Sequence, residues 1–191
     1  MGTEGLLIGI TGGFGSGKST ASSFFESKGF KTIILSLFLE EEAKRRGFKK
    51  ITRKILQNIG NEWRKNFGSG VLAEKAIACI KKGKIKRAVI DGIRNLREVE
   101  RLRKEKNFVL LAIIADKKIR FERLKNLKRR EKLTWELFRK LDRRDMGLGQ
   151  KQTGLRVLAC LRKADSYIEN NQSLGEFKNN LAKFLGSIKL S

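Results

Sequence analysis

The chain has 191 residues, 40% of them hydrophobic, and its 44 lysines and arginines outnumber 20 acidic residues, which gives a net charge of +24. This length suits a single α/β domain over residues 1–191 with a substantial core, and no apolar run approaches the ~20 residues of a membrane-spanning helix. Because histidine is absent, histidine triads, histidine general bases and histidine metal ligands are excluded.

The cysteines and the first residues favour a cytoplasmic protein. Cys79 and Cys160 lack the spacing of metal ligands, so a reducing compartment with two structural thiols is the simplest account. Residues 1–5 lack the charged-then-apolar layout of a signal peptide. The basic residues are spread along the whole chain, which favours a solvated lysine-rich surface over a nucleic-acid-binding face, although nucleic acid is kept as an alternative partner.

A glycine-rich stretch follows the first predicted strand. Residues 6–10 form a short apolar run that predicts a buried parallel strand. The stretch after it contains Gly12, Gly13, Phe14, Gly15, Ser16, Gly17, Lys18, Ser19 and Thr20. These residues fit G-x-x-x-x-G-K-[ST], and a helical pattern begins at Ser19, so strand, loop and helix have the order of a phosphate-binding loop. A glycine turn with a chance lysine is the plainer alternative.

The residue types explain how this whole loop would bind ATP. Glycines allow backbone N–H groups to approach phosphate oxygens closely, and the helix N-terminus adds its dipole. Lys18 is expected to reach the β- and γ-phosphates, and the Ser19 hydroxyl is expected to ligate Mg²⁺. A dinucleotide-binding motif is excluded because Lys18 stands where its third glycine would be.

The next segments predict one strand and three helices. Residues 31–35 predict the second strand, and Ser36 is expected to cap a helix over residues 37–46. Thr52 is expected to cap another helix, and residues 71–83 predict a third.

The third predicted strand, residues 87–91, ends in an acid. An apolar run that ends in Asp91 is typical of a Walker B strand. Ligand crevices in open α/β sheets lie at the carboxyl ends of the strands, so Asp91 is expected to hold Mg²⁺ directly or through water. Arg94 would point into the same crevice, where its planar guanidinium suits a phosphate or carboxylate. The plain alternative is a strand end with a surface arginine.

The most basic segment follows a predicted strand over Phe108–Ile114 and a helix that Asp116 is expected to cap. Its apolar residues interleave with the charges at helical spacing, which predicts either a solvated helix pair or a mobile cationic lid over about 128–147. We favour the lid, in which arginines such as Arg129 and Arg143 would neutralise charge on a transferring phosphoryl group.

The sequence contains no internal repeat, and the remaining segments predict three helices and one strand. The other predicted elements are helices over 96–106, 157–164 and 174–185 and a fifth strand over 165–170.

Several segments resemble known kinases. The loop from Thr11 to Thr20 resembles that of dephospho-CoA kinases, as does A-D-S-Y-I-E-N-N at residues 164–171. Other segments resemble a branch of the nucleoside monophosphate kinase superfamily that includes archaeal kinase-like proteins and kinase-like domains joined to deoxycytidylate deaminases. These segments are 59–64, 89–95, 120–124 and 142–145.

The resemblance implies a P-loop α/β fold with three layers, α/β/α, around a five-stranded parallel sheet. It also implies a helical acceptor-binding region at about 37–83, a basic lid, and transfer of the γ-phosphate of ATP with Mg²⁺ to a small nucleotide-like acceptor. The residues carried over as phosphate, metal, acceptor or nucleotide positions are Lys18, Ser19, Asp91, Arg94 and Asn170.

One departure from the family pattern bears on the acceptor. Dephospho-CoA kinases and much of this branch carry an aspartate just after the second strand, where this chain has Ser36, Leu37 and Phe38. A hydroxyl acceptor needs its proton removed, whereas a nucleoside monophosphate is already anionic. We therefore favour a nucleoside monophosphate, with dephospho-CoA second. A nucleotide-binding regulatory module or a nucleic-acid-associated NTPase is the alternative of another class. The base preference and the oligomeric state are left open.

Overall fold

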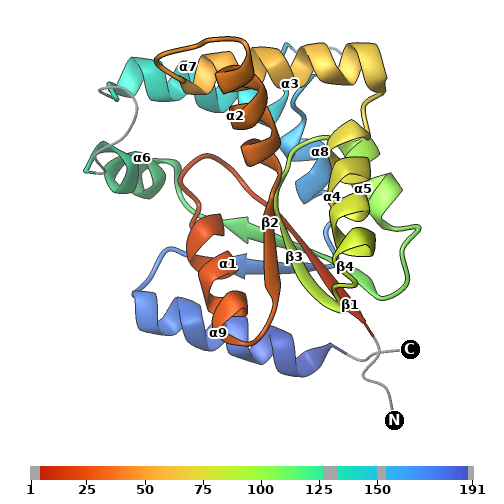
Figure 1. The fold of residues 1–191 in the computed structure, drawn as a ribbon. Helices are drawn as coiled ribbons and strands as arrows, with labels where there is room; N and C mark the ends of the chain where they lie inside the picture. Colours follow the sequence, from red (N-terminus) through yellow and green to blue (C-terminus); the bar gives the residue numbers. More distant parts are fainter. Residues whose placement is uncertain (1–4, 127–132, 150–153, 189–191) are drawn as a thin grey trace.

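The computed structural model describes residues 5–126, 133–149 and 154–188, and its centre is a parallel β-sheet. Five strands lie in the order β2-β3-β1-β4-β5, and every pairing between them is parallel (Figure 1). The strands are β1 (Leu6–Thr11), β2 (Lys31–Ile34), β3 (Arg87–Ile93), β4 (Phe108–Ile114) and β5 (Ser166–Glu169). The predicted sheet is therefore confirmed.

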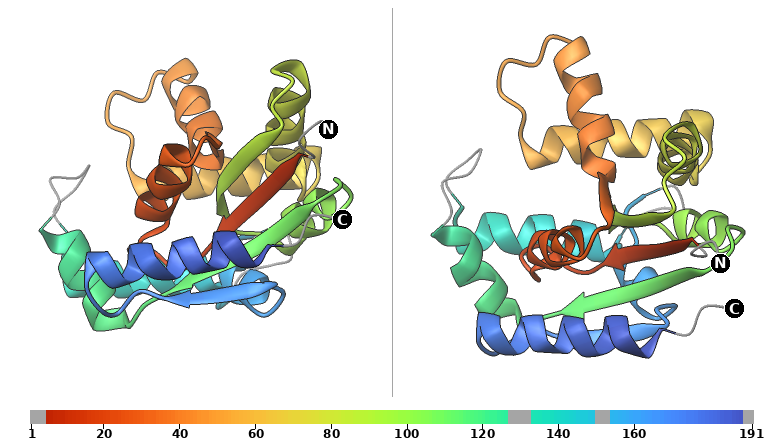
Figure 2. Two further views of the ribbon diagram at one scale, coloured as in Figure 1. Left: turned by 90° about the horizontal axis from the view of Figure 1, so that it is seen from below. Right: turned by 60° about the horizontal axis from the view of Figure 1, so that its bottom comes forward.

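The strands are apolar on both faces because helices cover both sides. Alternate residues of β1 pack into opposite cores: Ile8 and Ile10 lie in one cluster and Leu7 in the other. The first cluster is closed by α1 (Lys18–Ser27) and α9 (Leu174–Ser187). Figures 1 and 2 show these two helices together on one side of the sheet.

The opposite face carries α4 (Val71–Lys82), α5 (Leu96–Leu102) and α8 (Val157–Leu161), which gives three layers, α/β/α. The remaining helices within the described ranges are α2 (Leu35–Arg45), α3 (Arg53–Phe67), α6 (Lys117–Lys125) and α7 (Trp135–Met146). In Figure 1, α2, α3 and α7 lie together at the top. No helix in the described ranges has both the length and the apolar character that crossing a membrane requires.

Of three predicted helix caps, one is wrong, one has the predicted position without a capping hydrogen bond, and one is right. Helix α2 begins at Leu35, directly after β2, so Ser36 lies inside the helix rather than at its cap. Leu35 is only 1% exposed, and its packing into the core starts the helix before the polar residue. Asp116 stands at the N-cap position of α6, but its side chain makes no capping hydrogen bond there. The Thr52 hydroxyl does accept a hydrogen bond from the N–H of Ile55.

Strand β3 continues two residues beyond its predicted end at Asp91. The register between β1 and β3 shifts after Ile10, so that Thr11 pairs with Ile93. The Thr11 hydroxyl donates to the carbonyl of Ile93 at 2.9 Å, which satisfies a buried backbone group at this irregularity. Asp91 therefore lies within the strand and not at its last position.

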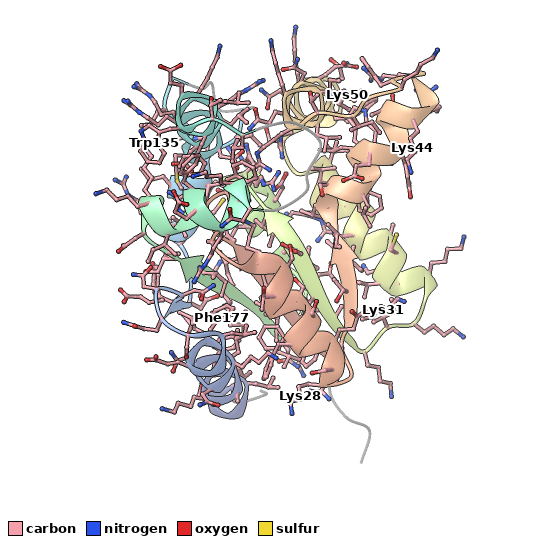
Figure 3. All side chains as sticks on the ribbon, turned by 90° about the vertical axis from the view of Figure 1, so that its left-hand side faces the viewer. Lys28, Lys31, Lys44, Lys50, Trp135 and Phe177 are labelled. Atoms are coloured by element: carbon pink, nitrogen blue, oxygen red, sulfur yellow. The ribbon has the colours of Figure 1, made fainter. Side chains whose placement is uncertain are left out.

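The two cysteines differ in burial. Cys160 is buried in the core, whereas Cys79 is exposed, so only one of the two predicted structural thiols packs inside. Figure 3 shows lysines along the height of one view, from Lys50 at the top to Lys28 at the bottom.

Candidate active site

The glycine-rich loop joins β1 to α1 and needs its glycines. Gly17 is the N-cap of α1 with a φ of 103°, a left-handed conformation that side chains rarely adopt. A Cβ atom at Gly17 would lie 2.2 Å from Nδ2 of Asn170, and one at Gly12 would lie 2.3 Å from the carbonyl oxygen of Ile113. Larger residues at these two positions would therefore push the loop away from the strands behind it.

The lysine of the loop is held by the loop itself. Lys18 Nζ donates to the carbonyl oxygens of Gly12 at 2.8 Å and Gly13 at 2.9 Å. Burial of the amine, followed by the nearby charge of Arg94, lowers the pKa of Lys18 to about 7, and the charge of Asp91 opposes this. An anionic ligand would favour the charged amine, so the site is poised to take up a proton when it binds a phosphate.

Side chains from outside the glycine-rich loop donate hydrogen bonds to its backbone carbonyl groups. The Asn170 amide donates to the carbonyl of Ser16 at 2.9 Å, and Arg123 donates to the Asn170 carbonyl at 2.8 Å. Arg120 donates to the carbonyl of Phe14 at 3.0 Å and forms an ion pair with Asp142 of α7. These contacts give the loop a fixed shape, which is what preorganised binding of an anion requires.

A cavity of about 750 Å³ lies beside the loop. Its lining residues are Phe14, Gly15, Gly17, Lys18, Ser19, Thr20, Ile34, Ser36, Glu40, Arg53, Leu56, Gln57, Asp91, Gly92, Arg94, Arg123, Leu124, Leu133 and Leu141. The lining thus contains four cationic and two acidic side chains together with apolar ones. The cavity forms where β3 turns into α5, as expected for a ligand crevice in an open α/β sheet.

Asp91 and Arg94 reach this cavity from one short segment. Glu98, a buried residue of α5, accepts hydrogen bonds from the backbone N–H groups of Arg94 at 2.8 Å and Asn95 at 3.1 Å. Its other oxygen accepts from Arg64 of α3, whose Nη2 lies 2.8 Å away, and the two side chains are 0% and 2% exposed. The position of Arg94 is therefore set by a buried ion pair between two helices.

The far wall is built by α3 and α7. Arg53 pairs with Asp145, and the Gln57 amide donates to the same carboxylate at 2.9 Å. Burial alone would raise the pKa of the Asp145 carboxyl, but the charges of Arg53, Arg94 and Lys18 outweigh burial and hold this pKa below its ordinary value.

The Phe14 ring of the loop joins this wall. The Arg53 guanidinium lies 3.9 Å from the centroid of the Phe14 ring, and the ring of Phe138 in α7 stacks at 6.2 Å. Arg53 and Gln57 were not predicted from the sequence. The only sequence feature that points to them is their spacing of four residues, which places them on one face of α3.

Most of the predicted site residues meet at this cavity. Those that line it are Phe14, Gly15, Gly17, Lys18, Ser19, Thr20, Asp91 and Arg94. Those that belong to the loop or its surroundings without lining it are Gly12, Gly13, Ser16 and Asn170. Arg143 is exposed and lies outside the lining, so its role stays a prediction. Arg129 lies outside the described residues, as does part of the predicted lid, 128–132.

The residue at the family's aspartate position does not face the cavity. Leu37 is 47% exposed and is not among the lining residues. The carboxylate that α2 contributes is Glu40, together with the Ser36 hydroxyl. An acid therefore reaches the cavity from α2 even though it stands three residues later in the chain.

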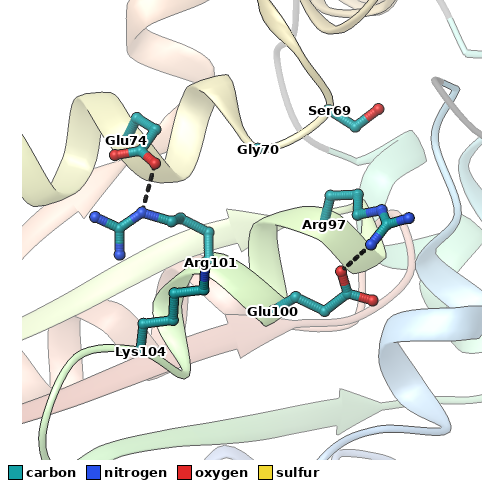
Figure 4. Close-up of a pocket in the computed structure, with 7 residues that line it drawn as sticks. All are labelled: Ser69, Gly70, Glu74, Arg97, Glu100, Arg101 and Lys104. Atoms are coloured by element: carbon teal, nitrogen blue, oxygen red, sulfur yellow. Dashed lines mark hydrogen bonds and ion pairs between the residues drawn. The ribbon is translucent and has the colours of Figure 1, made fainter.

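A second cavity, of about 330 Å³, lies between α4 and α5 (Figure 4). Its arginines are occupied: Arg101 pairs with Glu74, and Arg97 pairs with Glu100 at 2.7 Å. None of the residues of the glycine-rich loop lines it. The cavity beside the loop is therefore the candidate site.

Solved structures of two kinases share the fold of this chain. Shikimate kinase from Acinetobacter baumannii superposes with a TM-score of 0.58 and 14% identity over 98% of this chain and 97% of that protein. A sugar kinase from a Janibacter species gives 0.53 and 13% over 95% of each chain.

Sequence relatives define the family. No protein-family model matches the chain. A UPF0200 protein from Hyperthermus butylicus is 32% identical over 188 residues, which cover 98% of this chain and 97% of the relative. One from Pyrococcus horikoshii is 32% identical over 190 residues, covering 96% of each. The chain therefore belongs to the UPF0200 family.

Proposed function

We propose that this protein is an ATP-dependent phosphotransferase of nucleoside monophosphate kinase type, which transfers the γ-phosphate to a nucleotide-like small molecule. The observation that carries the proposal is the convergence of Lys18, Ser19, Asp91 and Arg94 on one cavity. The kinase-like fold supports it, because the glycine-rich loop has the place in the fold that phosphate binding requires.

The lining residues divide the work of phosphoryl transfer. Lys18 would bind the β- and γ-phosphates, and Ser19 with Asp91 would hold Mg²⁺, which neutralises phosphate charge when bound. Arg94 and Arg123 would stabilise charge on the transferring group. The bond from the γ-phosphorus to the β,γ-bridging oxygen breaks, ADP departs, and an acceptor oxygen forms the new bond to phosphorus. An acceptor phosphate needs no base for this step.

Dephospho-CoA stays the second candidate because one observation favours it. Glu40 places a carboxylate in the cavity, and a hydroxyl acceptor would need such a base. The dispersed charge of +24 keeps the nucleic-acid-associated NTPase as the alternative of another class.

A screen of acceptors tests the proposal. ATP and Mg²⁺ are incubated with each nucleoside monophosphate or with dephospho-CoA, and both ADP formation and the mass of the phosphorylated product are measured. We expect ADP formation that depends on a monophosphate. Hydrolysis without any phosphorylated product, stimulated by added nucleic acid, would contradict the kinase and favour the NTPase.

A further inference from the structure

Gln57 is a buried polar residue in the wall of the candidate site. It is 3% exposed, lies on α3 and lines the cavity beside the loop. Its Nε2 donates to Asp145 Oδ1 at 2.9 Å. Its Oε1 is also buried, and no group in the described part of the chain donates to it. A buried carbonyl oxygen without a partner loses the hydrogen bonds that water would give it.

The orientation of this amide is fixed by its neighbour. Asp145 is paired with Arg53, so it is ionised and its oxygens can only accept hydrogen bonds. The NH₂ group of Gln57 must therefore face Asp145, and flipping the amide would bring two oxygens together. As a result Oε1 is the atom left without a partner.

The side chain that carries this buried acceptor lines a cavity whose other charged groups are mostly donors. The side chains of Lys18, Arg53, Arg94 and Arg123 all line it, and each suits an anionic group. An anionic oxygen cannot donate to Gln57 Oε1, which is a neutral acceptor. A ligand that satisfies the whole wall must carry an anionic group and also a neutral N–H or O–H donor.

We propose that Gln57 is a specificity-determining residue for the acceptor and that its Oε1 accepts a hydrogen bond from a neutral N–H or O–H of an anionic, nucleotide-like molecule. This inference rests on the proposed function, because it assigns the acceptor to the same cavity. In CMP and AMP, whose bases carry no ring N–H, this donor has two sources, a ribose hydroxyl or the amino group of the base.

Equilibrium binding to the unmodified protein gives the first test. Calorimetry with a non-hydrolysable ATP analogue and Mg²⁺ compares each monophosphate with an analogue that lacks one donor. The ribose arm uses 2′-deoxy and 3′-deoxy forms, and the base arm replaces the amino group of CMP or AMP by hydrogen. We expect one arm to lose about 10- to 100-fold in affinity, because the analogue leaves a buried oxygen unpaired.

A variant assigns that selectivity to Gln57. Gln57→Met keeps the length of the side chain and removes the acceptor, so the difference between parent and analogue should shrink to within about twofold. Asn66→Leu, on the exposed end of the same helix, should keep the full difference. Unchanged thermal unfolding and unchanged binding of the ATP analogue show that each variant is folded.

The outcomes separate this inference from the proposed function. Equal affinity for every parent and analogue, no binding of any monophosphate, or full selectivity in Gln57→Met would each overturn the role of Gln57. Phosphoryl transfer is measured separately in the screen of acceptors. Selective binding that Gln57→Met abolishes, without any transfer, would support the Gln57 site and contradict the kinase.

Discussion

The Lys18 amine donates hydrogen bonds to two carbonyl oxygens of its own loop, and its surroundings change its protonation. The amine lies in a site where burial and Arg94 disfavour its charge, so its pKa is lowered to about 7. Phosphate oxygens reverse that balance, since an anion favours the charged amine. Binding of a nucleotide and protonation of Lys18 are therefore linked.

Proton uptake on nucleotide binding measures this linkage. Below pH 7 the free amine is already protonated, whereas above pH 7 it is largely neutral and must take up a proton to meet the phosphates. Calorimetry at about pH 8.5 in buffers of different ionisation enthalpy should show uptake of roughly one proton, and at about pH 6 far less. Affinity should fall as pH rises above 7. Uptake that persists in Lys18→Arg would contradict the assignment.

Removal of the amine tests the catalytic role of Lys18 directly. We expect Lys18→Ala to fold and to lose at least ~10²-fold in phosphoryl transfer, as for removal of one preorganised donor at a developing charge. The rate is measured with the acceptor found in the screen, and circular dichroism controls for folding. Wild-type turnover in the folded variant would show that the loop is not the site of transfer.

Two acids of α7 connect this helix to the rest of the site. Asp142 pairs with Arg120 at 2.5 Å, and Asp145 pairs with Arg53. Both acids are buried, and both arginines also contact the Phe14 segment of the loop, one through its carbonyl and one over its ring. The loop, α3 and α7 therefore share one set of contacts.

Loss of the Asp145 charge should weaken this assembly. Asp145→Asn removes the buried negative charge that pairs with Arg53, and a broken buried pair destabilises a protein by about 3 kcal/mol. Urea unfolding measures the change. Glu100→Gln removes the acid of the exposed pair with Arg97 and should leave the midpoint unchanged. Equal midpoints for both variants would mean that Asp145 does not hold α7 in place.

The elements differ in how well their sequence predicts them. Strands β1 and β4 are almost entirely apolar, and β3 contains an apolar run at residues 88–90, as expected for a sheet covered by helices on both faces. All three strands were predicted, β3 with an end two residues too early. Arg53 and Gln57 were missed because a polar pair on an amphipathic helix looks the same whether it faces water or a cavity. Only the docking of α7, through a distant acid, turns that face inward.

At the scale of the molecule, the net charge of +24 comes from basic residues spread along the whole sequence, and lysines lie from top to bottom of the view in Figure 3. Such a surface attracts nucleic acid weakly and without sequence preference. We expect affinity for duplex DNA to fall by roughly 10³-fold between ~50 and ~200 mM salt, while acceptor-dependent ADP formation changes little. ATP hydrolysis that rises severalfold with nucleic acid at the higher salt would argue for the NTPase.

The buried pair of Arg64 with Glu98 restricts how α3 can move. It fixes the second half of α3 to the segment that carries Arg94, while Arg53 and Gln57 stand near the first turn of the same helix. Because Arg53 and Gln57 also bind Asp145 of α7, α3 is held near both ends. Displacing α3 alone would break two buried pairs, each costing several kcal/mol, so any movement of α3 would have to carry the Arg94 segment and α7 with it.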